Sequence, residues 1–100
     1  MSVIVIGRMT VEPGNVEKLW SEHKSDFEAI AAAAKAAGAI HHRWGLGEDH
    51  VVIIDEWPTA ESFQKFFESQ PRIADLMQAA GVQGPPEFDI LRAKDAPDQF

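Results

Sequence analysis

The chain has 100 residues, of which 45% are hydrophobic and 25% are charged, a composition typical of one soluble globular domain. Its 16 acidic and 9 basic residues give a net charge of −7, which argues against nucleic acid or an anionic membrane as a partner. Cysteine is absent, and this excludes disulfides, thiolate metal sites and a cysteine nucleophile together.

Residues 1–6 have no basic start and only a short apolar run, so they are typical of a strand rather than of a signal peptide. No apolar stretch approaches the roughly 20 residues that are needed to cross a bilayer. The sequence therefore predicts a cytoplasmic protein.

The first predicted strand spans residues 3–11, which are rich in valine and isoleucine, and it ends at the turn residues 12–14. One helix is expected from a cap at Asn15 to about Ala37, with Gly38 ending it. Apolar and aromatic residues recur along it at three- and four-residue steps, with one histidine among them: Val16, Leu19, Trp20, His23, Phe27, Ile30 and Ala34. This stripe is expected to pack on the sheet.

Residues 40–46 and 50–57 are predicted to pair as a hairpin, because residues 47–49 (GED) are typical of a tight turn. Pro58 ends the second of these strands.

Two shorter helices and a last strand complete the chain. Thr59 is expected to cap the first helix, and Pro71 to begin the second, which ends at Gly81. A rigid loop is predicted at residues 84–86 (GPP), followed by a strand at residues 88–93.

The predicted order is strand, helix, strand, strand, helix, strand, which is the βαββαβ arrangement of a ferredoxin-like α+β fold. Its antiparallel sheet is expected to have the strand order 4-1-3-2. Residues 1–94 form a single domain in this prediction, and residues 95–100 form a polar C-terminal tail.

Both faces of the predicted sheet carry apolar side chains. Val5 and Met9 face one way along the first strand, whereas Ile4 and Ile6 face the other way. Because both helical segments lie on one face, we expect a second copy of the chain to cover the helix-free face, giving a homodimer.

Two segments resemble the antibiotic biosynthesis monooxygenase superfamily. They are residues 4–14 (IVIGRMTVEPG), a strand and turn before a long helix, and residues 51–63, in which the strand VVIIDEW precedes a short helix with AESF. The resemblance covers residues 3–94 and implies a dimeric α+β barrel. The superfamily includes cofactor-free oxygenases, haem-degrading enzymes, isomerases and proteins of unknown role.

The haem-degrading branch of that superfamily matches this chain at Trp57 only. Those enzymes carry an asparagine where this chain has Gly7, and a haem-ligating histidine on the later helix, where residues 73–80 contain none. Haem is therefore not expected as a cofactor, and the resemblance implies O2 as a co-substrate without a further cofactor.

A hairpin turn at residues 48–49 would place three cross-strand pairs on one face of the sheet. The expected pairs are Trp44 with Ile53, His42 with Asp55, and Ile40 with Trp57. A slip by one residue would move His42 to the opposite face. The sequence predicts an aromatic-lined pocket for a small apolar or aromatic ligand between this face and the helices. The expected walls are Trp20, Phe27, Trp44, Trp57, Phe63 and Phe67.

Three polar residues are candidates for catalysis in this pocket. His42 is proposed as a general base that Asp55 holds in one tautomer, and His23 as a second proton-transfer or oxyanion group. The alternatives are a structural His42–Asp55 pair and a core histidine at position 23 bonded to the backbone. The three residues lack the close spacing of a metal triad, so no metal is expected.

From the resemblance and these residues, we expect the chain to be a cofactor-independent monooxygenase that acts on a small aromatic or polyketide-like substrate. Two alternatives remain open at this point. One is a non-catalytic module that binds a small ligand, and the other is an isomerase or cyclase that uses the same residues without oxygen.

Overall fold

Valine- and isoleucine-rich strands form the centre of the sheet in the computed structural model, which describes residues 1–100. Strand β1 (Val3–Thr10) pairs with β3 (His50–Trp57), and β2 (His41–Leu46) and β4 (Gln83–Arg92) form the two edges. All pairings are antiparallel, and the order β2-β3-β1-β4 confirms the prediction. The ferredoxin-like α+β class is confirmed as well.

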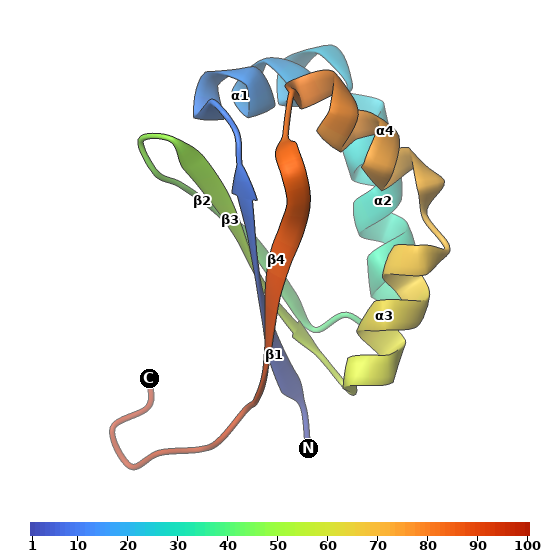
Figure 1. Ribbon diagram of the computed structural model, residues 1–100. Helices are drawn as coiled ribbons and strands as arrows, with labels where there is room; N and C mark the ends of the chain where they lie inside the picture. Colours follow the sequence, from blue (N-terminus) through green and yellow to red (C-terminus); the bar gives the residue numbers. More distant parts are fainter.

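Four helices cover one face of this sheet and leave the other face without a helix (Figure 1). They are α1 (Pro13–Glu22), α2 (Lys24–Ala36), α3 (Ala60–Glu68) and α4 (Pro71–Ala80). None of them combines the length and the apolar character that a passage through a bilayer requires.

The first helical segment is two helices rather than the single helix that the periodicity predicts. His23 has φ −124° and ψ 35°, outside the helical region, and separates α1 from α2. The prediction of Asn15 as the cap is also wrong, because Pro13 already occupies the first helical position, where its missing N–H costs nothing. The Asn15 side chain instead donates to the Ala80 carbonyl oxygen at 3.0 Å, which ties α1 to the end of α4.

The last strand begins earlier than predicted, because β4 includes Pro85 and Pro86 instead of starting after them. Proline cannot donate to a sheet ladder, but β4 is an edge strand with one unpaired side, where this loss is tolerated. The pairing of β4 with β1 shifts register between Arg8 and Thr10, next to these prolines.

The predicted turns and caps of the second half are present. Gly47 N–H donates to the His50 carbonyl oxygen at 2.9 Å and closes the β2–β3 hairpin. The Thr59 hydroxyl accepts from Ser62 N–H at 3.0 Å in a capping box. Gly81 ends α4 with φ +83°, a left-handed conformation that glycine adopts without strain.

Two hydrophobic clusters lie between helices and sheet. One joins β1, α1 and β3 to the end of α4 and consists of Met9, Val11, Val16, Leu19, Val51 and Ala80. The other joins β1 and β3 to α3 and consists of Val5, Trp57, Phe63 and Phe66. Only 13 of the 100 residues are buried, because the helices enclose a cavity between the two clusters and one sheet face stays open.

Candidate functional site

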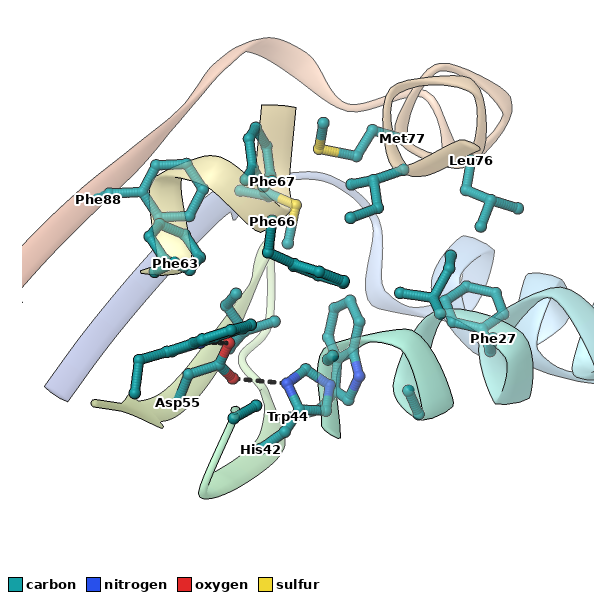
Figure 2. Close-up of a pocket in the computed structure, with 18 of the residues that line it drawn as sticks. Phe27, His42, Trp44, Asp55, Phe63, Phe66, Phe67, Leu76, Met77 and Phe88 are labelled. Atoms are coloured by element: carbon teal, nitrogen blue, oxygen red, sulfur yellow. Dashed lines mark hydrogen bonds and ion pairs between the residues drawn. The ribbon is translucent and has the colours of Figure 1, made fainter. Parts of the chain in front are cut away.

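A cavity of about 550 Å³ lies between the four helices and the sheet. Of the 25 residues that line it, 21 are hydrophobic, which is typical of a site for an apolar small molecule. Helix α2 contributes Phe27, and α4 contributes Leu76 and Met77 (Figure 2). Ile30 of α2 also lines the cavity.

Aromatic side chains form one end of the cavity. Trp57 packs on Phe66 with ring centroids 5.2 Å apart, and Phe88 of β4 meets Phe63 and Phe67 edge to face at 5.4 and 5.3 Å. Such contacts fix the rings relative to one another and give this end of the cavity a defined shape. Figure 2 shows the cluster beside the cavity.

Three hydrogen-bonded residues form the polar part of the site. The predicted strand register is confirmed, since His42 lies opposite Asp55 and Trp44 opposite Ile53. His42 Nδ1 lies 2.5 Å from Asp55 Oδ1 (Figure 2). Trp57 Nε1 donates to Asp55 Oδ2 at 3.2 Å. Both oxygens of this buried carboxylate therefore have a partner.

The hydrogen bond to Asp55 determines which nitrogen of His42 is basic. An ionised carboxylate only accepts, so Nδ1 carries the proton and Nε2 keeps its lone pair. Nε2 makes no hydrogen bond within the chain. The His42 side chain is 45% exposed and lines the cavity, so Nε2 can take a proton from a bound molecule and exchange it with water.

The sequence-predicted walls separate into two groups. Phe27, Trp44, Trp57, Phe63 and Phe67 all line the cavity. Trp20 of α1 does not line it and instead packs on Trp44, where the two indoles meet edge to face with ring centroids 5.4 Å apart.

His23 also lies outside the cavity lining, contrary to the predicted position. Because the helix breaks at this residue, its side chain does not continue the stripe that α2 presents to the sheet. Its Nδ1 lies 3.4 Å from Asp26 Oδ2, and Arg72 of α4 lies 3.7 Å from the other oxygen of that carboxylate. His23 therefore belongs to a partly exposed polar contact between the helix junction and α4.

Several lining residues were not predicted: Lys35, Phe66, Leu76, Met77 and Phe88. Phe66 lies three residues after Phe63 on α3, and this helical spacing was the sequence signal that could have predicted it as a lining residue. The position of Phe88 depends on the pairing of β4 with β1, which sets it opposite Gly7, and the position of Met77 depends on how α4 packs over the sheet. The local sequence encodes neither arrangement.

The residues present do not fit a haem. Helix α4 has no histidine, and a side chain at Gly7 would start 2.7 Å from Cε1 of Phe88, whose ring fills that space. No group of three or more His, Cys, Asp or Glu side chains is arranged to hold a metal ion.

Asp49 and His50 form a polar contact outside the cavity. A hydrogen bond with His50 holds the pKa of Asp49 below the ordinary value of an aspartate. Both residues lie at the β2–β3 turn, where this contact supports the hairpin.

Comparisons with known proteins give matches in structure but not in sequence. No model of a known protein family matches the chain, and no curated protein does. SnoaB from Streptomyces nogalater, a cofactor-independent oxygenase, superposes with a TM-score of 0.66 at 19% identity over 98% of each chain. The ActVA-Orf6 monooxygenase of Streptomyces coelicolor, in complex with Nanaomycin D, gives 0.70 at 19% identity over 95% of this chain and 89% of its own.

A dimeric ferredoxin-like protein from an uncultured marine organism gives a TM-score of 0.70 at 14% identity, covering 98% of this chain and 93% of its own. At these identities the likeness establishes the architecture and not the reaction. The chain therefore shares the ferredoxin-like α+β fold of these proteins.

Proposed function

We propose that this chain is a cofactor-independent monooxygenase that oxidises a small aromatic or polyketide-like substrate in the cavity between helices and sheet. The observation that carries the proposal is the hydrogen-bonded His42–Asp55 pair on the wall of a cavity whose lining is otherwise almost entirely apolar. The likeness in fold to SnoaB and to the ActVA-Orf6 monooxygenase supports the same assignment.

His42 acts as the general base in this proposal. A neutral imidazole can act as a base because one of its ring nitrogens keeps a lone pair that accepts a proton. Its Nε2 takes a proton from an acidic C–H or phenol of the substrate, which leaves a carbanion or phenolate. The resulting imidazolium lies beside the Asp55 carboxylate, 2.5 Å away, which stabilises its positive charge.

The substrate anion then supplies the electrons that reduce O2. It transfers one electron to O2, the two radicals combine into a peroxide, and loss of water leaves a ketone. For an anthrone, one CH2 group and one O2 become one C=O group and one H2O, so atoms and electrons balance without a further reductant. The apolar aromatic lining excludes water from the reactive anion.

Oxygen uptake with anthrone as the probe tests this proposal. Anthrone is a flat tricyclic ketone with an acidic CH2 group, and its oxidation to anthraquinone is followed by absorbance. We expect uptake with the wild type and a loss of about 10²- to 10⁴-fold in His42→Asn, because the base is removed. His50→Asn, a histidine that does not line the cavity, is the matched control.

Two results would assign a different function to this chain. Rearranged product formed under nitrogen would identify an isomerase or cyclase that uses the same residues. Binding of anthrone without uptake of oxygen, in wild type and His42→Asn alike, would identify a ligand-binding module.

The proposal includes a homodimer formed through the helix-free face of the sheet. By the alternation of the strands, that face carries five apolar side chains: Ile4, Ile6, Val52, Ile54 and Leu91. Ile54 and Leu91 are among the large hydrophobic residues that stay exposed in the single chain. A second copy would cover them, and the dimeric state of the marine ferredoxin-like protein supports this arrangement.

A further inference from the structure

The polar residues at the cavity have a charge pattern that the proposed proton transfer does not explain. Only four lining residues are not hydrophobic: Lys35, His41, His42 and Asp55. The chain has 16 acidic residues, yet Asp55 is the only one in the lining. Its carboxylate is buried and occupied by His42 and Trp57, so no free acidic group faces the cavity.

The exposed members of the lining locate the mouth of the cavity. Ala31 and Lys35 lie on the last two turns of α2. Ile40 directly precedes β2, and His41 and His42 are its first two residues. All five are exposed although they line the cavity. The mouth therefore opens between the C-terminal end of α2 and the edge strand β2.

Lys35 is the one permanently cationic side chain at this mouth. It forms no salt bridge, in contrast to Lys18, which pairs with Glu22 along α1. A lysine at such an edge lays its aliphatic stem along the apolar surface and keeps its ammonium group in water. Its charge is thus free to meet a charged group on an entering ligand.

We propose that Lys35 selects substrates with an acidic substituent, such as a carboxylate, at the end that remains at the mouth. The aromatic part of the molecule enters the cavity, and the anion stays at the surface beside the Lys35 ammonium. This inference rests on the proposed function for its site and names the class of molecule that the site takes. A free cation at the mouth also counteracts the repulsion that a chain of net charge −7 exerts on an anion.

A pair of fluorescent probes isolates the contribution of the charge. Anilinonaphthalene sulfonate and phenylnaphthylamine share the same rings and differ by one sulfonate group, and both brighten in apolar cavities. Lys35→Met keeps an apolar stem and removes the charge. We expect it to lower the affinity for the sulfonate probe roughly threefold to tenfold at low salt and to leave the affinity for the neutral probe unchanged. Lys35→Arg should restore the affinity, and Lys24→Met, at the other end of α2, is the matched control.

The possible results of this experiment test the role of Lys35 and the proposed function separately. Equal affinities of wild type and Lys35→Met for the sulfonate probe, or parallel losses for both probes, would overturn the role of Lys35. A structural effect at the C-terminal end of α2 would produce such parallel losses. If Ala34→Phe, which fills the cavity, displaces neither probe, the cavity itself is not the binding site and the proposed function fails with it. Because the assay measures binding alone, an absence of oxygen uptake does not affect its result.

Discussion

Trp57 donates its indole N–H to the Asp55 oxygen that His42 leaves free, at 3.2 Å. The two residues lie two positions apart on β3, so their side chains are on the same face of the sheet. Trp57 is therefore both a wall of the cavity and a hydrogen-bond donor that holds the carboxylate in position. The orientation of His42 depends on this carboxylate.

Replacing Trp57 by phenylalanine should show how much that N–H contributes to the stability of the fold. The variant leaves a buried carboxylate oxygen without a partner, which costs about 1–3 kcal/mol in the free energy of unfolding. Trp20→Phe removes an indole that makes no hydrogen bond and is the matched control. Urea unfolding of both variants measures the difference, and equal losses would show that the hydrogen bond contributes nothing beyond ring packing.

The tautomer of His42 is a second prediction. Because Nδ1 donates to Asp55, heteronuclear NMR of the imidazole nitrogens should show the Nδ1–H form at high pH. Asp55→Leu removes the acceptor at similar volume and should convert His42 to the Nε2–H form that free histidine prefers. His41, which is exposed and has no side-chain partner, serves as the internal reference. An Nε2–H signal for His42 in the wild type would be incompatible with the proposed base.

Two glycines in the sheet should respond differently to alanine. A Cβ at Gly7 would lie 2.7 Å from Phe88 Cε1 and 2.9 Å from Ile53 Cγ1, whereas one at Gly45 meets nothing within 4 Å. We expect Gly7→Ala to cost about 1–3 kcal/mol in stability through overpacking. Gly45→Ala should stay within about 0.5 kcal/mol. Thermal and urea unfolding check both values, and equal stabilities would mean that Phe88 moves away freely.

The proposed dimer interface can be tested with two aspartate substitutions, one on each face of the sheet. Ile54 on the helix-free face and Leu46 on the helix side are 45% and 44% exposed, so the two changes are matched. Ile54→Asp should shift the protein from dimer to monomer in light scattering, because it places a charge in the apolar interface. Leu46→Asp should remain dimeric. A monomeric wild type, or the same assembly state in both variants, would contradict the proposed interface.

The sheet and the His42–Asp55 pairing were predictable because short-range signals determine them. The turn residues 47–49 set the hairpin register, and the two-residue alternation then places His42, Asp55 and Trp57 on one face. Thr59 and Gly81 marked helix ends for equally local reasons, a side-chain cap and a left-handed backbone.

The parts that sequence did not predict depend on packing between elements. The apolar spacing continues through His23, so it gave no sign of the helix break at this residue, which lies outside the cavity lining. The prolines of β4 resembled a loop because only the completed sheet shows that this strand lies at an edge. Lys35 resembled an ordinary exposed lysine until the mouth of the cavity was located.

Proton abstraction by His42 is the central claim, and hydrogen exchange into D2O under nitrogen tests it without the oxygen step. NMR follows the loss of the CH2 signal of anthrone in the presence of the wild type or of His42→Asn. We predict that the wild type accelerates the exchange and that His42→Asn loses about 10²-fold or more of that acceleration. Equal exchange with both proteins, or none above the rate in buffer, would contradict the claim.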